Sequence, residues 1–226
     1  MPTIAIADDH IPTLKRFFNH FKNKEEYNIL IEAFDGYDLI TKLNTLKELP
    51  DIILIDINMP IMDGVAVTYY LKLFYPSVKV IGISVYSDEN TLKDILYSSA
   101  NGYIMKGLAE TVLDEAIATV LRGELYIDSR LDIEPDKLES ILANRKIVTE
   151  KENLFDLTKS ERQFVILNAT PLTYVQIAKT MFVDPQVIQN LYEHVSKKLN
   201  VYGREALTLF SLRNGLTRMV DFNYNH

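Results

Sequence analysis

Five polar residues stand at the ends of short apolar runs in the first half of the chain, where a purely structural strand has no need of them. They are two neighbouring carboxylates, a third carboxylate, a hydroxyl and a lysine, namely Asp8, Asp9, Asp56, Ser84 and Lys106. Three carboxylates in one partly desolvated crevice would repel one another, so we expect a cation among them. A small number of hard oxygen ligands, with water completing the shell, favours Mg²⁺.

A carboxylate beside a divalent cation can act as a nucleophile toward phosphorus. The cation would screen Asp56 and allow its carboxylate to attack a dianionic phosphoryl donor. Lys106 and the hydroxyl of Ser84 could then bind the new phosphoryl oxygens. In the alternative interpretation, Asp8 and Asp9 cap the next helix and Lys106 is a solvated loop residue. That interpretation explains any one of these residues, but it explains all five poorly.

The elements that position these residues alternate between strands and helices. Five apolar runs rich in Ile and Val are typical of buried strands, namely Thr3–Ala7, Ile29–Phe34, Asp51–Asp56, Lys79–Ser84 and Gly102–Met105. Segments of helical period lie between and after them, at residues 11–21, 39–46, 67–74 and 108–121. Such alternation predicts a parallel sheet covered by helices on both faces. Ligands of these sheets bind beyond the carboxyl ends of the strands, so the polar residues would converge on one crevice.

This constellation resembles the receiver domains of two-component response regulators over about residues 1–122. The matching segments are ADDH, DIILIDINMPIMDG, GISVYS and GYIMKG, at residues 7–10, 51–64, 82–87 and 102–107. The resemblance implies a flavodoxin-like (βα)5 doubly wound domain. It also implies that a partner histidine kinase phosphorylates Asp56. On the same basis Asp9, Asp56 and the main-chain carbonyl of Asn58 hold Mg²⁺, with Asp8 acting through water.

The resemblance further implies a switch. Tyr103 lies where the family keeps an aromatic residue that rotates inward as Ser84 moves toward the phosphate. The alternative for Tyr103 is an exposed strand aromatic. The last strand and its flanking helices would form a dimerisation or interdomain surface, so we expect a homodimer after phosphorylation. The only catalysis implied is that of the domain's own phosphorylation and dephosphorylation, so we expect no enzyme in the ordinary sense.

The last third of the chain has no convincing strands. Four helical segments are predicted there, at residues 160–168, 173–181, 185–199 and 204–213. Thr158 and Glu161 have the spacing of a capping box, and Asp184 before Pro185 is a good start for the third of these helices. Two helices joined by a tight turn form a helix-turn-helix scaffold. The alternative is a generic small helical bundle.

The spacing resembles the LuxR-type output domain of NarL/FixJ response regulators over about residues 154–216, an all-α helix-turn-helix domain. Residues 123–153 are then a linker with a possible short helix at 136–144, and residues 217–226 are a C-terminal tail. On this match residues 185–199 form the recognition helix. The candidate DNA contacts are amide side chains for base edges and cations for the backbone, namely Gln186, Gln189, Asn190, Lys197, Lys198 and Arg204.

Three departures from that pattern predict weaker DNA binding. Val175 stands where a Lys is common, Gln189 replaces a usual Lys or Arg, and Leu191 replaces a usual His. Contacts from Lys and Arg to phosphate dominate affinity for DNA, so their loss should weaken binding substantially.

Composition and charge exclude several classes of site. The chain of 226 residues is 47% apolar, carries a formal net charge of −7 and contains no Cys. Without thiols, disulfide frameworks, thiolate nucleophiles and zinc fingers are excluded. Residues 1–122 hold 11 basic and 17 acidic side chains, whereas residues 154–226 hold 8 and 6. An acidic front and a faintly basic rear fit a metal-binding domain followed by a nucleic-acid module.

The hydropathy pattern gives no sign of a membrane protein. No apolar stretch approaches the roughly 18 residues that a spanning helix needs. The first apolar run, TIAIA, has neither a charged leader nor a long apolar region. We therefore expect a cytoplasmic protein with no membrane partner.

A phosphorylation-controlled regulator of transcription is the leading interpretation, and two others stay open. In the first, the output domain is degenerate and the phosphorylated protein acts by binding other proteins. In the second, the string ILIDIN at residues 53–58 places the chain near haloacid-dehalogenase-type phosphohydrolases, whose nucleophilic Asp is followed two residues later by an acid/base Asp. Asn58 stands at that place and cannot transfer a proton. The acidic pair after the first strand also has no role in that fold.

Overall fold

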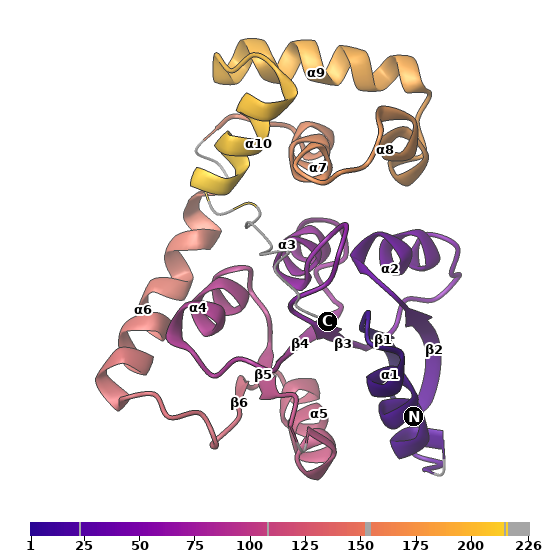
Figure 1. Cartoon of the computed structure of the whole chain (residues 1–226), viewed down its shortest axis with the longest axis vertical. Helices are drawn as coiled ribbons and strands as arrows, with labels where there is room; N and C mark the ends of the chain where they lie inside the picture. The colour runs from indigo at the N-terminus through magenta and orange to yellow at the C-terminus, as the bar shows by residue number, and fades with distance from the viewer. Residues whose placement is uncertain (23, 108, 152–154, 215, 217–226) are drawn as a thin grey trace. The chain divides into compact units, whose positions relative to one another are not determined.

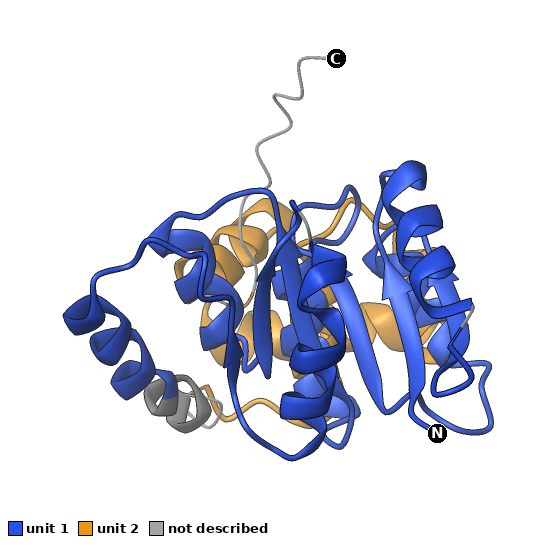
Figure 2. Ribbon diagram, turned by 90° about the horizontal axis from the view of Figure 1, so that it is seen from below, with its two compact units in different colours: residues 1–148 blue, residues 149–226 orange. Residues whose placement is uncertain are grey.

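The computed structural model divides the chain into two compact units, residues 1–148 and residues 149–226 (Figure 2). It describes residues 1–22, 24–107, 109–151, 155–214 and 216. Among these residues, no helix is long and apolar enough to cross a bilayer.

The first unit is built on a six-stranded sheet in which every neighbouring pair of strands is parallel, in the order β2-β1-β3-β4-β5-β6 (Figure 1). The strands are β1 (Thr3–Ala7), β2 (Asn28–Ala33), β3 (Ile52–Asp56), β4 (Lys79–Ser84), β5 (Gly102–Met105) and β6 (Tyr126–Ile127). The order reverses between β1 and β3, because the chain runs from β1 out to β2 and then returns past β1. The predicted parallel sheet is confirmed, and the reversal marks the place where such sheets bind ligands.

Helices cover both faces of this sheet (Figure 1). They are α1 (Ile11–Lys22), α2 (Gly36–Leu43), α3 (Gly64–Phe74), α4 (Glu89–Tyr97) and α5 (Leu113–Leu121), with a short 3₁₀ helix at Ala109–Thr111. Helix α6 (Pro135–Lys151) follows β6 and lies beside α4 (Figure 1). Buried residues of α1 and α5, such as Phe17 and Ile117, share one cluster with the sheet. Leu92 and Ile95 of α4 share the other cluster with Tyr103.

The sheet unit departs from the predicted elements in four places. Helix α4 and the two-residue strand β6 were not predicted, and β6 lies inside the stretch expected to be a linker. The helix predicted at residues 136–144 is longer, and its Ile141 is buried in the first unit's second cluster. Ile11, an apolar residue of the helical segment predicted at residues 11–21, is 53% exposed, because it occupies the first position of the helix. Short elements such as β6 carry too few residues for a periodic signal.

The second unit is helical, as predicted. Its helices are α7 (Lys159–Asn168), α8 (Tyr174–Met181), α9 (Pro185–Leu199) and α10 (Arg204–Arg213). Thr158 and Glu161 form the predicted capping box, and the Asp184 side chain accepts a hydrogen bond from the amide of Gln186 at the start of α9. Apolar side chains from all four helices are buried in its core, including Phe164, Ile177, Ile188 and Leu207. The turn between α8 and α9 contains Phe182 in the left-handed conformation, at φ 54°.

Candidate functional site

Three carboxylates meet at the carboxyl ends of β1 and β3, where the strand order reverses. One ligand oxygen from each of Asp8, Asp9 and Asp56 lies within 4.8 Å of the others. Asp8 and Asp56 are only 1% and 5% exposed, whereas Asp9 is exposed. The close approach follows from the pairing of β1 with β3, which aligns Ala7 with Ile55 and so brings the next residues together. The structure therefore brings together the acidic residues that the sequence placed in one crevice.

Lys106 lies against two of these carboxylates. Its ammonium Nζ is 2.8 Å from Asp56 Oδ2 and 2.9 Å from Asp8 Oδ2, and its side chain is 12% exposed. Lys106 follows β5, and its amide donates to the carbonyl of Ser84 at 2.6 Å, which fixes the loop against the end of β4. One ammonium offsets one of the three negative charges. The remaining charge and the cluster of carboxylate oxygens suit a divalent cation.

Burial dominates the electrostatics of the cluster. Burial raises the pKa of Asp56 to about 6, against the opposing effect of Lys106, and the nearby Asp8 raises it further. Burial likewise raises the pKa of Asp8. For Lys106 burial opposes the charged form, but attraction to Asp56 and Asp8 outweighs it and raises the pKa. Lys106 therefore stays charged, but its single ammonium does not offset the effect of burial on the pKa values of Asp8 and Asp56.

The turns beside the cluster hold the acidic residues in place. Asp8 Oδ1 accepts from the amide of His10 at 2.9 Å, so this carboxylate also orders the turn before α1. The amide of Asn58 donates to Asp56 Oδ1 at 3.3 Å, which places Asn58 directly beside this carboxylate. A Cβ at Gly64 would lie 2.4 Å from the carbonyl oxygen of Asp56, so the turn after β3 closes only with glycine at this position.

Ser84 and Tyr103 are both tied to the main chain of Tyr86. Ser84 is fully buried at the end of β4, and its Oγ accepts from the amide of Tyr86 at 3.1 Å. The ring of Tyr103 is also fully buried, and its hydroxyl donates to the carbonyl of Tyr86. The alternative of an exposed strand aromatic is therefore wrong for Tyr103. The ring is turned inward in this structure, with its hydroxyl on the loop that carries Ser84.

Sequence reasoning missed two residues near the cluster, Asp128 and Arg130, because both lie in the stretch assigned to a linker. Asp128 is buried and accepts from the amide of Met105 at 3.0 Å. Arg130 donates to the carbonyl of Gly107 at 2.7 Å. The two contacted residues, Met105 and Gly107, directly precede and follow Lys106. The available signal was an aspartate directly after an apolar pair, Tyr126–Ile127, which repeats the arrangement at the end of β1.

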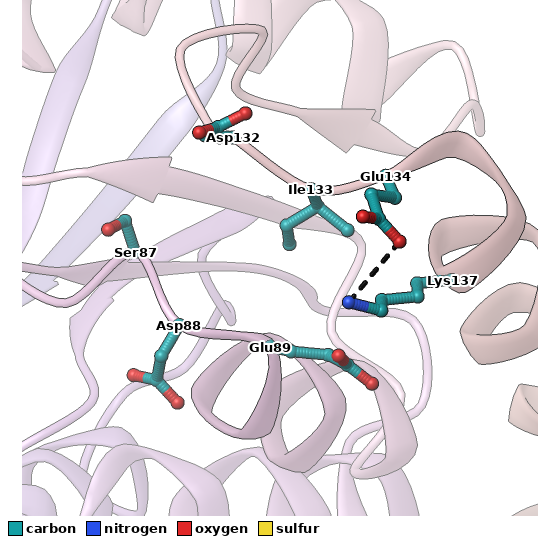
Figure 3. Close-up of a pocket in the computed structure, with 7 residues that line it drawn as sticks. All are labelled: Ser87, Asp88, Glu89, Asp132, Ile133, Glu134 and Lys137. Atoms are coloured by element: carbon teal, nitrogen blue, oxygen red, sulfur yellow. Dashed lines mark ion pairs between the residues drawn. The ribbon is translucent and has the colours of Figure 1, made fainter.

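A separate hollow of the first unit lies between the start of α4 and the segment that leads into α6 (Figure 3). Its lining is mostly acidic and consists of Ser87, Asp88, Glu89, Asp132, Ile133, Glu134 and Lys137. Lys137 Nζ lies 3.3 Å from Glu134 Oε2, and Lys93 Nζ lies 2.7 Å from Glu89 Oε1, so two of these carboxylates are paired. The hollow shares no residue with the carboxylate cluster, but it shows that the segment after Arg130 borders the loop after β4.

The candidate DNA contacts divide into two groups. Gln186, Gln189, Asn190 and Lys197 are exposed on α9, and Gln189 Nε2 donates to Glu193 Oε1 at 3.1 Å. These side chains lie on one long helix whose opposite face is buried through Ile188 and Val195. Their exposure leaves them accessible to a partner.

Lys198 and Arg204 have structural contacts within the second unit instead. Lys198 Nζ lies 2.9 Å from Glu161 Oε2 and donates to the carbonyl of Asp156. Arg204 donates to the carbonyls of Thr170 and Leu172. These contacts hold α9 and α10 against the start of α7 and the turn after it. Both cations thus have structural contacts, and their predicted role as contacts to a nucleic-acid backbone stays a prediction.

Known proteins resemble this chain over nearly its whole length, so the similarity includes both units. Residues 4–118 match the family described as response regulator receiver domain. The transcriptional regulatory protein DegU of Brevibacillus brevis is 28% identical, over 96% of this chain and 95% of that protein. The oxygen regulatory protein NreC of Staphylococcus epidermidis is also 28% identical, over 94% of this chain and 98% of the relative.

The solved structures include RcsB from Salmonella enterica serovar Typhimurium bound to promoter rprA in the presence of the phosphomimetic BeF3⁻. It aligns with a TM-score of 0.51 and 24% identity, over 93% of this chain and 98% of that one. At this identity the likeness establishes a shared fold.

Proposed function

The chain belongs to the response regulator receiver domain family and is a NarL/FixJ-type response regulator, and on that premise we propose that phosphorylation of Asp56 controls DNA binding by its helical unit. The observation that carries the proposal is the position of Lys106 Nζ, 2.8 Å from Asp56 Oδ2 at the carboxyl ends of the strands. A buried carboxylate with a lysine at this distance has a nucleophile and a cation for phosphoryl oxygens in one place.

The proposed reaction is phosphoryl transfer from a phosphohistidine of a partner kinase. An oxygen of Asp56 attacks the phosphorus, an O–P bond forms as the N–P bond breaks, and the imidazole leaves. Lys106 exchanges its contact with Asp56 for one with a phosphoryl oxygen, and the hydroxyl of Ser84 donates to another. The chain catalyses only this transfer and the later hydrolysis of the aspartyl phosphate, in which water releases inorganic phosphate and restores the carboxylate, because Asn58 offers no acid/base group for turnover of other substrates.

We propose Mg²⁺ as the cation of the acidic cluster. The ligands are Asp9, Asp56 and the main-chain carbonyl of Asn58, with Asp8 acting through water. When bound, the ion neutralises charge so that a phosphoryl dianion can approach the carboxylates. The exposure of Asp9 supports the assignment, because an ion that keeps several waters needs an open side.

Phosphorylation adds about −1.5 to −2 charge and strong acceptor oxygens at Asp56. Ser84 and Lys106 gain a shared partner, so the loops after β4 and β5 shift toward it. We propose that this change favours a homodimer through the face formed by β5 and its flanking helices. Ile141 of α6 packs on the cluster that contains Leu92 of α4, so α6 borders the surface that would respond.

The helical unit supplies the output. We propose that α9 enters the DNA major groove and that Gln186, Gln189 and Asn190 contact base edges, with Lys197 as a phosphate contact. The relatives support this assignment, because DegU is a transcriptional regulatory protein and RcsB is bound to a promoter in its solved complex. A bacterial regulator of this kind acts in the cytoplasm, where its kinase partner and DNA are both accessible.

A second function rests on a specific observation. Lys198 pairs with Glu161, and Arg204 donates to main-chain carbonyls of the same unit, so both cations have donors directed to the unit rather than to a DNA backbone. Such a unit could instead bind a protein partner under the control of the receiver.

Selection from a random DNA library with phosphorylated and unphosphorylated protein separates the two functions. The main proposal predicts an enriched motif that the phosphorylated protein selects more strongly. If no sequence is enriched in either state and binding is absent even at low salt, the interaction function replaces it.

A further inference from the structure

Three successive main-chain carbonyls around Lys106 accept hydrogen bonds from arginine side chains. Arg130 donates to Met105 at 3.3 Å and to Gly107 at 2.7 Å. Arg16 of α1 donates to the carbonyl of Lys106 itself at 3.2 Å. A surface loop would ordinarily leave such carbonyls to water. Here the planar guanidinium of Arg130 spans the position of Lys106 from one side to the other.

Asp128 holds Arg130 in this position. It accepts from Arg130 Nε at 2.8 Å, from Arg130 Nη2 and from the Arg130 amide at 3.0 Å. The same carboxylate accepts from the amide of Met105 at 3.0 Å. Because Asp128 is buried, its charge requires these donors, and the charge-assisted bonds are short and directional. The amide and carbonyl before Lys106 and the carbonyl after it are therefore bound by one aspartate–arginine pair.

We propose that Arg130, held by Asp128, is a positioning residue for Lys106 in the phosphoryl transfer. The inference rests on the proposed function and extends it to a pair that lies outside the carboxylate cluster. Lys106 must exchange Asp56 for a phosphoryl oxygen while its backbone stays in place. A displacement of about 1 Å at such a group is enough to slow a reaction strongly. Arg130 prevents that displacement because it binds the chain on both sides of the lysine.

The same pair begins the segment that leads into α6. Residues 132–134 of this segment line one side of the hollow in Figure 3, and Ser87, Asp88 and Glu89 line the other. The segment thus borders the loop after β4 and is bonded to the loop after β5. The loop after β4 begins directly after Ser84, and the loop after β5 contains Lys106. The start of this segment is therefore bonded to the loop after β5, and residues 132–134 lie across the hollow from the loop after β4.

The test compares Arg130→Ala with Arg130→Lys and with the control Arg122→Ala in the full chain. Arg122 pairs with Glu124 on the surface, where the two side chains are 57% and 60% exposed. Two quantities are measured, namely the rate of labelling by acetyl phosphate with Mg²⁺ and the amide exchange of Met105 and Lys106.

We expect Arg130→Ala to slow labelling about tenfold and to speed amide exchange at both residues. Arg130→Lys should restore part of the labelling rate, because a lysine keeps the pair with Asp128 but cannot span both carbonyls. Arg122→Ala should match the wild type in both measurements.

The outcomes separate this inference from the proposed function. Unchanged exchange in Arg130→Ala overturns the positioning role, whether or not the protein is labelled. Faster exchange with an unchanged labelling rate overturns its role in the reaction. If the wild type itself is not labelled, the proposed function fails and the role in the reaction fails with it, while the exchange data still decide whether Arg130 holds the loop.

Discussion

The hydroxyl of Tyr103 donates a hydrogen bond to the main-chain carbonyl of Tyr86, two residues beyond Ser84. The amide of Tyr86 donates in turn to Ser84 Oγ, so one residue of the loop contacts both side chains. Any movement of Ser84 toward a phosphate must therefore alter the environment of the Tyr103 hydroxyl. This contact gives the inward position of the ring a physical cause.

Replacing Tyr103 with Phe should remove that contact while the ring stays buried. We expect the opening free energy of the β4 and β5 amides to fall by about 1 kcal/mol, the usual net value of one hydrogen bond. Native-state hydrogen exchange on the full chain measures it residue by residue. Tyr86→Phe is the control, because it changes a half-exposed side chain and keeps the main-chain carbonyl. Equal protection in Tyr103→Phe and the wild type would show that the contact adds no stability.

Lys106→Met should leave the carboxylate of Asp56 in place but remove the cation beside it. We expect labelling by acetyl phosphate to slow by about 100-fold, the effect of removing one preorganised charge from a transition state. Lys93→Met is the matched control, since Lys93 pairs with Glu89 on the surface of α4. Comparable rates in Lys106→Met and Lys93→Met would exclude Lys106 from the reaction.

The second unit should lose stability in acid through Glu161. Burial alone would raise the pKa of Glu161, but hydrogen bonds from Lys198 and Thr158 outweigh it and hold the pKa below its ordinary value of 4.5. A lowered folded-state pKa contributes stability that is present above pH 4.5 and is lost as the pH falls through the folded value.

The amide exchange of α7 and α9, followed across pH, measures this loss. Glu161→Gln should remove that part of the pH dependence and cost about 1.5–3 kcal/mol at neutral pH, because a charge-assisted bond is lost. The exposed Glu205 provides the control Glu205→Gln. An acid response of Glu161→Gln identical to that of the wild type would contradict the assignment.

Two adjacent lysines should have different roles. Both are exposed, but only Lys198 is bonded to Glu161 and to the carbonyl of Asp156. Lys197→Ala should weaken DNA binding and reduce the slope of log affinity against log salt by about 1. Lys198→Ala should mainly destabilise the second unit, because it leaves the buried Glu161 without its cation. Salt titrations and unfolding of both variants measure this, and the reverse pattern would exchange the two roles.

The sequence allowed the sheet and most of the cluster to be predicted because its signals there are local. Each strand is a continuous apolar run, and the polar residue at its end stands out against that run. Asp8, Asp56 and Lys106 are up to 98 positions apart, but the parallel topology places the ends of their strands at the same edge of the sheet. The capping box at Thr158 was predictable for the same reason, since its two residues are three positions apart.

The features that were missed depend on pairings across the chain. Arg130 contacts Gly107 across 23 positions, and neither residue carries a periodic pattern that indicates the other. The pair of Lys198 with Glu161 spans 37 positions, so the sequence did not show that this lysine, predicted to contact the DNA backbone, also binds a carboxylate of its own unit. Strand β6 has only two residues, and its place in the sheet depends on β5.

The central claim is that the carboxylate of Asp56 accepts phosphate. Its most direct test is labelling of the full chain by acetyl phosphate with Mg²⁺, followed by intact mass, for the wild type, Asp56→Asn and the control Asp136→Asn on the exposed start of α6. We expect one phosphoryl group on the wild type and on Asp136→Asn, no labelling of Asp56→Asn, and no labelling of the wild type when the metal is chelated. Undiminished labelling of Asp56→Asn would contradict the claim.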